Sequence, residues 1–276
     1  RHGAWNPVDI DPIQEQVRRS ELGLSKAAYR AQLADLMARF NSVAAANPYA
    51  MFDDAMTAAE IGEESSKNRL MGDPHLKSMV AKDGVNQASA LVLTRWETAQ
   101  SLGVADRAIF LHGHATGSEP QVLNRNSLGQ SEAMAVAYRN ALAGAGIEAE
   151  QIGAADLYSC FPIAVWVAMD VLDMTLDDPR PLTLTGGLPF FGGPGNNYST
   201  HGIAEMIHWL RAQPEPSYGV VGANGGYLSK HAVGVYANIP GEFPEAVPEF
   251  KASEVVEVVS DPEPEGVIES YTFQPQ

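Results

Sequence analysis

The side chains best placed to do chemistry lie along one segment of the sequence, residues 182–209. An apolar run at 182–185 leads into a loop rich in glycine and asparagine, and the residues after the loop repeat with the spacing of an amphipathic helix. Glycine lets a backbone turn tightly and approach a ligand without a clashing Cβ. The loop holds five glycines: Gly186, Gly187, Gly192, Gly193 and Gly195. The alternative interpretation is a strand–turn–helix connection whose glycines serve packing alone.

Asparagines and proton-transfer groups surround this loop. Asn196 and Asn197 stand at the expected helix start, where free backbone N–H groups favour developing negative charge. His201 lies one helical turn beyond the loop and can act as a base if its pKa lies near the working pH, or it can pack or cap the helix. Tyr158 can donate a hydrogen bond to an oxyanion or move a proton, or it can be a buried strand tyrosine.

Three further histidines have weaker patterns. His231 follows a glycine turn made by Asn224, Gly225 and Gly226; it can face the same cleft or simply belong to the turn. His112 and His114 alternate at an expected strand end, which places both on one side. No carboxylate stands at ligand spacing from them, so the sequence predicts no metal site.

The elements that must position these groups alternate between strand and helix after Gly103. We expect strands at 108–111, 155–160, 182–185, 218–222 and 233–237. We expect helices at 131–143, from Pro162, which suits a first helical position, and after Asn196. Such alternation predicts an α/β layer structure.

Before Gly103 the pattern is less regular. We expect irregular chain over 1–24, because two prolines interrupt it, and then a helix capped by Ser25. A loop-rich passage at 49–82, a buried strand at 88–94 and a helix at 95–101 follow.

Composition limits the possible functions. A chain of 276 residues can form one large domain or two smaller ones. The net charge of −16 argues against nucleic-acid binding, which needs basic clusters; nine acidic residues and one lysine at 241–276 account for half of it. No apolar run reaches membrane-spanning length and no signal segment is present, so no membrane role is expected. The single cysteine, Cys160, fits a reducing compartment, and we expect a cytoplasmic protein.

Three loops resemble, in order and spacing, the carboxyl-terminal half of the thiolase superfamily. They read DLYSCF at 156–161, GGLPFFGGPGNNYSTHG at 186–202 and GANGGY at 222–227. The family has a DLHDCF-like loop, a GGL…GHP loop that opens a helix, and a CxGxG loop. Residues 68–94 look like the segment that closes the amino-terminal half. The resemblance is closest to thiolases related to sterol carrier protein 2 and to actinobacterial thiolase-like proteins of type 1, which keep loops like GGPxNNY and NGGxxxKH.

The departures from the family fall on the positions that carry its reaction. Tyr158 and Ser159 stand where the family usually has His and Asp. Aligned from the glycine pair, Gly193 replaces the catalytic His; aligned back from the helix, Asn196 does. Ala223 replaces the acid/base Cys of the third loop. The family's nucleophilic Cys lies in the amino-terminal half, which this chain mostly lacks.

The resemblance implies a layered αβαβα thiolase-like fold, of which this chain supplies mainly the carboxyl-terminal half. Residues 1–105 would hold a loop region and the end of the amino-terminal half, and residues 106–240 the carboxyl-terminal half. Residues 241–276 would form an acidic linker and the start of an additional domain, with its first strand at 266–273. Both ends of the chain then look cut.

The resemblance also implies acyl-CoA as the ligand, with a CoA thioester as substrate and no resident cofactor. The catalytic candidates are Tyr158, Cys160, Asn196, His201 and His231. The substrate-binding candidates are Gly187, Gly193, Asn197, Asn224, Gly225 and Gly226. Cys160 coincides with a family cysteine that borders the reaction site, although a buried, inert thiol is the alternative.

Thiolysis needs a thiolate and a second proton-transfer group, and the sequence lacks both at the family's positions. We therefore expect acyltransferase or retro-aldol/Claisen-type C–C chemistry in lipid metabolism. The alternatives are a catalytically silent acyl-CoA-binding protein and a partner subunit. The partner would be the remaining amino-terminal thiolase half or a second chain, and a dimer is one possible assembly.

Overall fold

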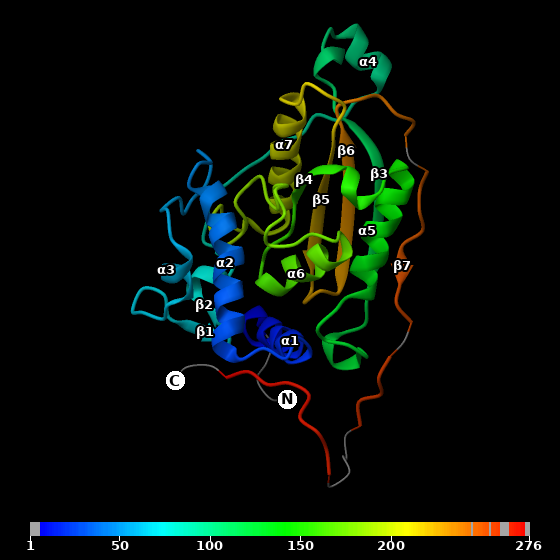
Figure 1. The fold of residues 1–276 in the computed structure, drawn as a ribbon. Coiled ribbons are helices and arrows are strands. Elements are labelled where there is room, and N and C mark those ends of the chain that lie inside the picture. Colours follow the sequence, from blue (N-terminus) through cyan, green and yellow to red (C-terminus); the bar gives the residue numbers. More distant parts are fainter. Residues whose placement is uncertain (1–5, 244, 254, 260–264, 274–276) are drawn as a thin grey trace.

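A mixed five-stranded sheet forms the centre of the protein (Figure 1). The computed structural model describes residues 6–243, 245–253, 255–259 and 265–273. Across the sheet the order is β4 (Ile152–Asp156), β5 (Tyr218–Gly225), β6 (Lys230–Ala237), β3 (Phe110–Ser118) and β7 (Phe250–Lys251). The pairs β4–β5 and β3–β7 are parallel, and the two middle pairs are antiparallel. A separate small sheet joins β1 (Leu70–Gly72) to β2 (His75–Leu76).

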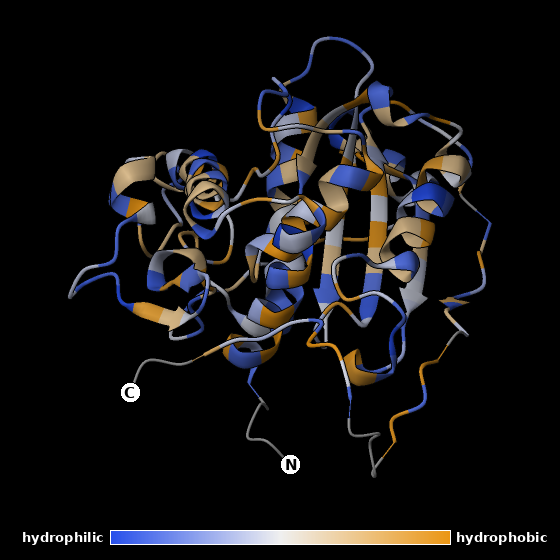
Figure 2. Cartoon of the chain, turned by 60° about the horizontal axis from the view of Figure 1, so that its bottom comes forward, coloured by the Kyte–Doolittle hydropathy of each residue, from blue (hydrophilic) through white to orange (hydrophobic). Residues whose placement is uncertain are grey.

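Helices cover both faces of the central sheet. Helix α5 (Glu132–Ala145) lies on one face, where a Cβ on Gly117 would come within 2.5 Å of the Ala133 carbonyl. Helix α7 (Tyr198–Arg211) lies on the other, where a Cβ on Gly219 would overlap the sulfur of Met206. The glycines of these strands therefore set how closely the helices approach. Figure 2 shows hydrophobic segments of the central strands enclosed between helices.

A further helical group packs beside α5. It contains α6 (Pro162–Val171), α2 (Lys26–Ala44), α1 (Pro7–Glu21) and the short α3 (Ala58–Gly62). The Ser25 hydroxyl caps α2 by accepting from Ala28 N at 3.2 Å, as expected, and the apolar side chains of α2, among them Leu33 and Phe40, are buried. Proline 162 occupies the first turn of α6, and Ser131 caps α5. These local signals work because they involve groups within a few residues of each other.

The expectation of irregular chain over 1–24 is wrong, because α1 occupies most of that stretch. Pro7 lies in the first helical turn, where its missing N–H is not needed. Pro12 lies inside the helix and leaves the Val8 carbonyl without its usual donor. That carbonyl lies against Gly72, where a Cβ would come within 2.4 Å of it. Because Gly72 has no side chain, β1 can pack closely against α1 at Pro12.

The strand expected at 88–94 is also not formed. The segment is extended and pairs with no strand in the described part of the chain, and the side chains of Val92 and Leu93 are 94% and 92% exposed. It leads to α4 (Trp96–Ser101), which is the helix expected at 95–101. An apolar run becomes a strand only when another strand pairs with it, and periodicity alone does not reveal that partner.

Two predicted strands beside the glycine loop differ from the structure. The strand expected at 155–160 ends at Asp156. The segment 182–185 is not a strand, although backbone hydrogen bonds hold residues 181 and 182 beside β4. The Asp156 carboxylate instead accepts the N–H groups of Leu184 and Thr185, at 2.8 and 3.0 Å. The Asp156 side chain, rather than the backbone of a neighbouring strand, therefore binds the N–H groups of this segment.

The strand expected at 108–111 is longer and carries both histidines within it. The imidazole of His112 binds the Ile239 carbonyl at 2.9 Å, and the ring of His114 lies 6.4 Å from that of Phe243. Both therefore contact the segment that follows β6.

The carboxyl-terminal segment 265–273 forms no strand. The Ser270 hydroxyl donates to the Ile13 carbonyl at 2.6 Å, and the Lys26 ammonium lies 5.1 Å from the Tyr271 ring centre. It also lies beside the turn between β1 and β2, where Asp73 N donates to the Phe273 carbonyl at 3.3 Å, but this backbone bond does not extend into a ladder. Across the described residues, none of the helices has both the length and the apolar character needed to cross a membrane.

Candidate functional site

Tyr158 and Cys160 lie in the short connection between β4 and α6. The Tyr158 ring packs edge-on against that of Tyr198, with centres 5.4 Å apart. The Tyr198 hydroxyl is fully buried and lies 2.8 Å from Thr185 Oγ1. Burial raises the pKa of Tyr158, and the neighbouring Cys160 adds to the effect. The phenol therefore remains protonated at neutral pH and can act as a hydrogen-bond donor.

Cys160 meets the end of β5 across the site. The amide of Asn224 lies 3.6 Å from its sulfur, a separation that a thiol hydrogen bond can span. Burial raises the pKa of the Cys160 thiol, and Asp11 raises it further, while Asn224 lowers it slightly. Because the thiolate is the nucleophilic form, Cys160 in this structure is a neutral thiol and a weak nucleophile.

The glycine loop is tied to Lys82. The backbone carbonyl of Lys82 accepts from Gly193 N at 2.8 Å, and the Lys82 ammonium donates to the Pro189 carbonyl at 2.5 Å. The N–H of Gly187 donates to Thr185 Oγ1 at 3.2 Å. The two substrate-binding candidates among the glycines of this loop, Gly187 and Gly193, therefore have their N–H groups engaged within the protein. A Cβ on Gly187 would clash with Phe40, so its role is close packing.

The loop then turns into α7 through a short 3₁₀ segment, Gly195–Asn197. Asn196 is exposed there, and the Asn197 amide lies 3.2 Å from His201 Nε2. The His201 ring packs against Phe191 with centres 5.2 Å apart. Burial lowers the pKa of His201, so the imidazole is neutral near pH 7 and can accept a proton. Phe191 also contacts Tyr198, and Tyr198 contacts Tyr158. A row of aromatic rings therefore separates His201 from Tyr158.

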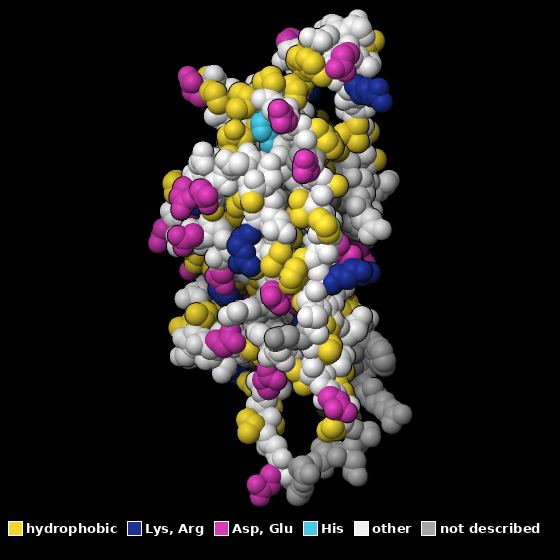
Figure 3. Space-filling view, turned by 90° about the vertical axis from the view of Figure 1, so that its right-hand side faces the viewer, with side chains coloured by type: hydrophobic (Ala, Val, Ile, Leu, Met, Phe, Trp, Pro, Cys, Tyr) yellow, Lys and Arg dark blue, Asp and Glu magenta, His cyan; other side chains and the backbone are white. Residues whose placement is uncertain are grey.

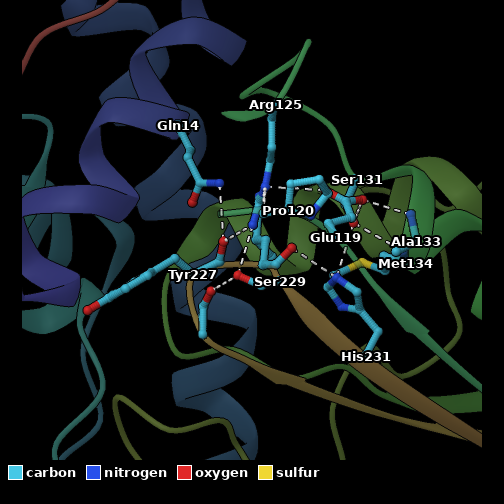
Figure 4. Close-up of polar contacts among 12 residues, drawn as sticks. Gln14, Glu119, Pro120, Arg125, Ser131, Ala133, Met134, Tyr227, Ser229 and His231 are labelled. Carbon is cyan, nitrogen blue, oxygen red and sulfur yellow. Dashed lines mark hydrogen bonds and ion pairs between the residues drawn. The ribbon is translucent and has the colours of Figure 1, made fainter. Parts of the chain in front are cut away.

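His231 belongs to a different group, at the turn between β5 and β6 (Figure 4). Its Nε2 lies 3.1 Å from both Ser131 Oγ and the Leu228 carbonyl. The Ser131 hydroxyl donates to Glu119 at 2.6 Å, so the imidazole is the donor towards Ser131 and Leu228. Burial lowers the pKa of His231 to about 4. Its contacts join it to the start of α5 and to the turn, and they make it a structural group.

The turn between β5 and β6 has a strained backbone, and side chains from other parts of the chain hydrogen-bond to it. Gly226, Tyr227 and Leu228 all have φ near +60°, a region that non-glycine residues rarely adopt. Arg125 donates to the Tyr227 carbonyl at 2.9 Å, and Gln14 of α1 approaches the same oxygen at 3.5 Å (Figure 4). Gly225 and Gly226 therefore shape the turn that ends β5, and Asn224 just before them faces the site.

Comparison with known proteins identifies this arrangement. No protein-family model and no curated protein matches the sequence. Among solved structures, a monomeric SCP2-thiolase like protein type 1 from Mycobacterium smegmatis matches with a TM-score of 0.91 and 41% sequence identity. The match covers 99% of this chain. The chain belongs to the SCP2-thiolase-like family. It spans 62% of the length of the mycobacterial chain. The expected family and thiolase-like α/β fold are thus confirmed.

In this SCP2-thiolase-like chain the structure gathers part of the predicted site. Tyr158, Cys160 and Asn224 lie together, and His201 with Asn197 lies next to them across Phe191 and Tyr198. The family's His corresponds to Gly193 or to Asn196, and its Cys corresponds to Ala223, so neither an imidazole nor a thiol is present at these positions. His231 lies in its separate network.

Sequence reasoning missed the polar side chains that α1 brings to the site. Asp11 and Gln14 are buried there, with 2% and 0% exposure, although 1–24 was expected to be irregular. Proline at the first turn and polar residues repeating three and four positions apart are the signals that could have revealed this helix. Arg125 lies in a loop with no pattern that predicts its role.

Proposed function

We propose that this chain binds acyl-CoA and performs acyl transfer or retro-aldol/Claisen-type chemistry on CoA thioesters, in lipid metabolism, without thiolysis. The observation that carries the proposal is the grouping of Tyr158, Cys160 and Asn224 where β4 and β5 end. These strands are parallel neighbours, so their carboxyl ends share one edge of the sheet, the usual place for ligands in α/β folds. The phenol and the thiol are both protonated there.

A protonated phenol can stabilise the enolate that forms when a β-hydroxyacyl thioester is cleaved. In retro-aldol cleavage the β-hydroxyl gives its proton to a base, the Cα–Cβ bond breaks to release the Cβ fragment as an aldehyde or ketone, and the remaining thioester enolate takes the proton back at Cα. Tyr158 would donate a hydrogen bond to the thioester oxygen as charge develops. His201, neutral at pH 7, would receive the hydroxyl proton. Thiolysis would need a thiolate, and Cys160, the single cysteine of the sequence, is a neutral thiol.

A catalytically silent acyl-CoA-binding protein is the second candidate, favoured by Gly193 or Asn196 in place of the family's His and by Ala223 in place of its Cys. A partner-subunit role is compatible with either. The exposed run 88–94 favours a partner that supplies a strand, either the remaining amino-terminal thiolase half or a second chain. Figure 3 shows apolar side chains reaching the surface at the end of the molecule where α4 stands out.

Calorimetry and enzyme assays separate these functions. Calorimetric titration with acetyl-CoA should show binding, which Asn196→Leu should weaken by altering the exposed helix start. Acetoacetyl-CoA thiolysis should be negligible beside cleavage of a β-hydroxyacyl-CoA. Tyr158→Phe, which removes one oxyanion donor, should slow that cleavage by about 10²–10³-fold. Tyr49→Phe is the matched control, because Tyr49 is 64% exposed and outside the site.

Each outcome points to one function. Binding without any cleavage would favour the silent acyl-CoA-binding protein. Brisk thiolysis that Tyr158→Phe and His201→Ala leave unchanged would contradict the proposed chemistry. An absence of binding to CoA thioesters would contradict both acyl-CoA functions.

A further inference from the structure

Helix α1 is largely buried, yet it adds little to the apolar core. Apart from Pro12 and Val17, its buried side chains are polar: Asp9, Asp11, Gln14, Glu15 and Gln16. Among the described residues of the main apolar core, α1 contributes only the partly buried Val8, whereas α2 contributes several fully buried side chains. Burial of apolar surface is the main force that packs one element against another. Other interactions must therefore hold α1 in place.

Glu15 is the centre of these interactions. Its Oε1 accepts from the Tyr29 hydroxyl of α2 at 2.5 Å, and its Oε2 lies 2.8 Å from Nε2 of His75 in β2. All three side chains are 0% exposed. The other ring nitrogen of His75, Nδ1, is buried without a hydrogen-bond partner in the described chain, which offsets part of what these bonds gain. Glu15 therefore joins α1 to two other elements through hydrogen bonds rather than apolar packing.

Packing against the rest of the chain also leaves polar atoms of α1 unpaired. Asp11 Oδ1, Gln14 Oε1 and Arg18 Nε are buried, and none has a hydrogen-bond partner among the described residues. Such atoms lose their water without gaining a partner, so each of them favours the detached helix. A further contact, between Arg18 and Asp170 of α6, is an ion pair whose carboxylate is 52% exposed. Exposed ion pairs contribute little to stability.

The position of α1 connects it to the site. In Figure 1 it lies below the turn that joins β5 to β6, and Gln14 approaches the Tyr227 carbonyl of that turn at 3.5 Å. Asp11 interacts electrostatically with Cys160, just after β4. Between α1 and α2 the chain passes through Gly23, which has a φ of +65° and open space around it, and Leu24 after it packs on the core. The chain can therefore turn at Gly23 while α2 stays in place.

We propose that α1 is a lid that opens about Gly23 while the rest of the chain stays folded, and that Glu15 is the residue that holds it closed. Opening would uncover Cys160 and the turn after β5, so access to this side of the site depends on Glu15. The inference concerns a motion of the fold and does not depend on the chemistry of the ligand. An isolated helix of 15 residues is marginal in water, so the backbone N–H groups of a detached α1 would exchange with solvent.

Native-state hydrogen exchange followed by mass spectrometry tests the lid. In the wild-type chain the hydrogen-bonded amides of α1 should exchange at least about 100-fold faster than those of residues 33–40 in α2, because α1 opens without global unfolding. Glu15→Gln keeps the size of the side chain but replaces one acceptor oxygen with an NH₂ group. It should speed α1 exchange at least about tenfold relative to α2. Glu21→Gln, the same substitution at an exposed position of α1, should leave both rates unchanged.

Alkylation by iodoacetamide tests whether α1 covers the site, because Cys160 is the single cysteine of the sequence. Its rate should rise in Glu15→Gln by the same factor as α1 exchange and stay unchanged in Glu21→Gln. Wild-type α1 amides protected as strongly as those of α2 would overturn the lid, even if Glu15→Gln fails to fold. Unchanged α1 exchange in a folded Glu15→Gln would overturn the role of Glu15. Faster α1 exchange with unchanged alkylation would overturn the position of the lid over Cys160.

Discussion

The Asp156 carboxylate holds the chain that leads into the glycine loop, so its removal is a direct test of how this site is built. Its Oδ2 accepts from Leu184 N and Thr185 N at 2.8 and 3.0 Å, and from the hydroxyls of Thr183 and Thr185 at 3.0 and 3.1 Å. Asp156 is 1% exposed, so no water replaces a lost acceptor easily. In Asp156→Ala, the buried N–H of Thr185 and the partly buried N–H of Leu184 lose their partner.

The threonine hydroxyls are better placed to recover. They lie 3.2 Å apart, and Thr185 Oγ1 also lies 2.8 Å from the Tyr198 hydroxyl, so they can pair with each other. The cost therefore comes mainly from the two N–H groups, at about 1–3 kcal/mol each. The free energy of unfolding of Asp156→Ala should fall by about 2–6 kcal/mol. Asp156→Asn keeps one acceptor oxygen and should lose less.

Urea unfolding followed by circular dichroism measures this change, provided the slope with denaturant is the same for all variants. Asp177→Ala is the matched control, because Asp177 is exposed and its removal should change the free energy of unfolding by less than about 0.5 kcal/mol. If Asp156→Ala loses no more than this control, the carboxylate does not organise the loop. Acetyl-CoA affinity measured on the folded fraction should fall as well, since the same residues lead into the glycine loop that ends at Asn196 and Asn197.

Three further predictions concern titration and the exposed apolar run. Burial lowers the pKa of Lys82 to about 8, and repulsion from Lys77 makes a smaller contribution in the same direction. Above that pH the unfolded chain still binds a proton that the folded protein has lost, so the free energy of unfolding should rise from pH 8 towards the ordinary lysine pKa. Urea unfolding should show this slope in wild type and in the exposed control Lys251→Met; its persistence in Lys82→Met would refute the assignment. The pKa of His231, about 4 in the folded protein, lies below the ordinary value of 6.5, so stability should fall as pH drops from 6.5 towards 4. Thermal unfolding of His231→Gln at several pH values should show a smaller fall, and an unchanged one would count against this origin. Val92→Ser with Leu93→Ser should reduce self-association in light scattering and change the free energy of unfolding by less than about 0.5 kcal/mol, because both side chains are more than nine-tenths exposed. Unfolding of that double variant would show that the run is packed.

Sequence alone determined the parts of this protein that depend on neighbouring residues. Ser25 and Ser131 begin helices by capping groups three residues away, and Pro162 lies in the first turn of α6. The alternation of strands and helices after Gly103 predicted an α/β fold, and the loop motifs predicted the family. Local signals of this kind need no knowledge of what lies elsewhere in the chain.

Tertiary structure decided everything that required a distant partner. Residues 182–185 and 88–94 have the composition of strands, yet one is held by the Asp156 side chain and the other has no partner strand in the described chain. His231 has the residue type of a base, but Ser131, a hundred positions earlier, makes it a structural donor. Helix α1 continues through Pro12, and Gly72, sixty positions later, packs against the Val8 carbonyl that the proline leaves without its usual donor. The physical reason is the same in each case: a polar group or an apolar run specifies the kind of partner it needs, and only the folded chain determines which residue supplies it.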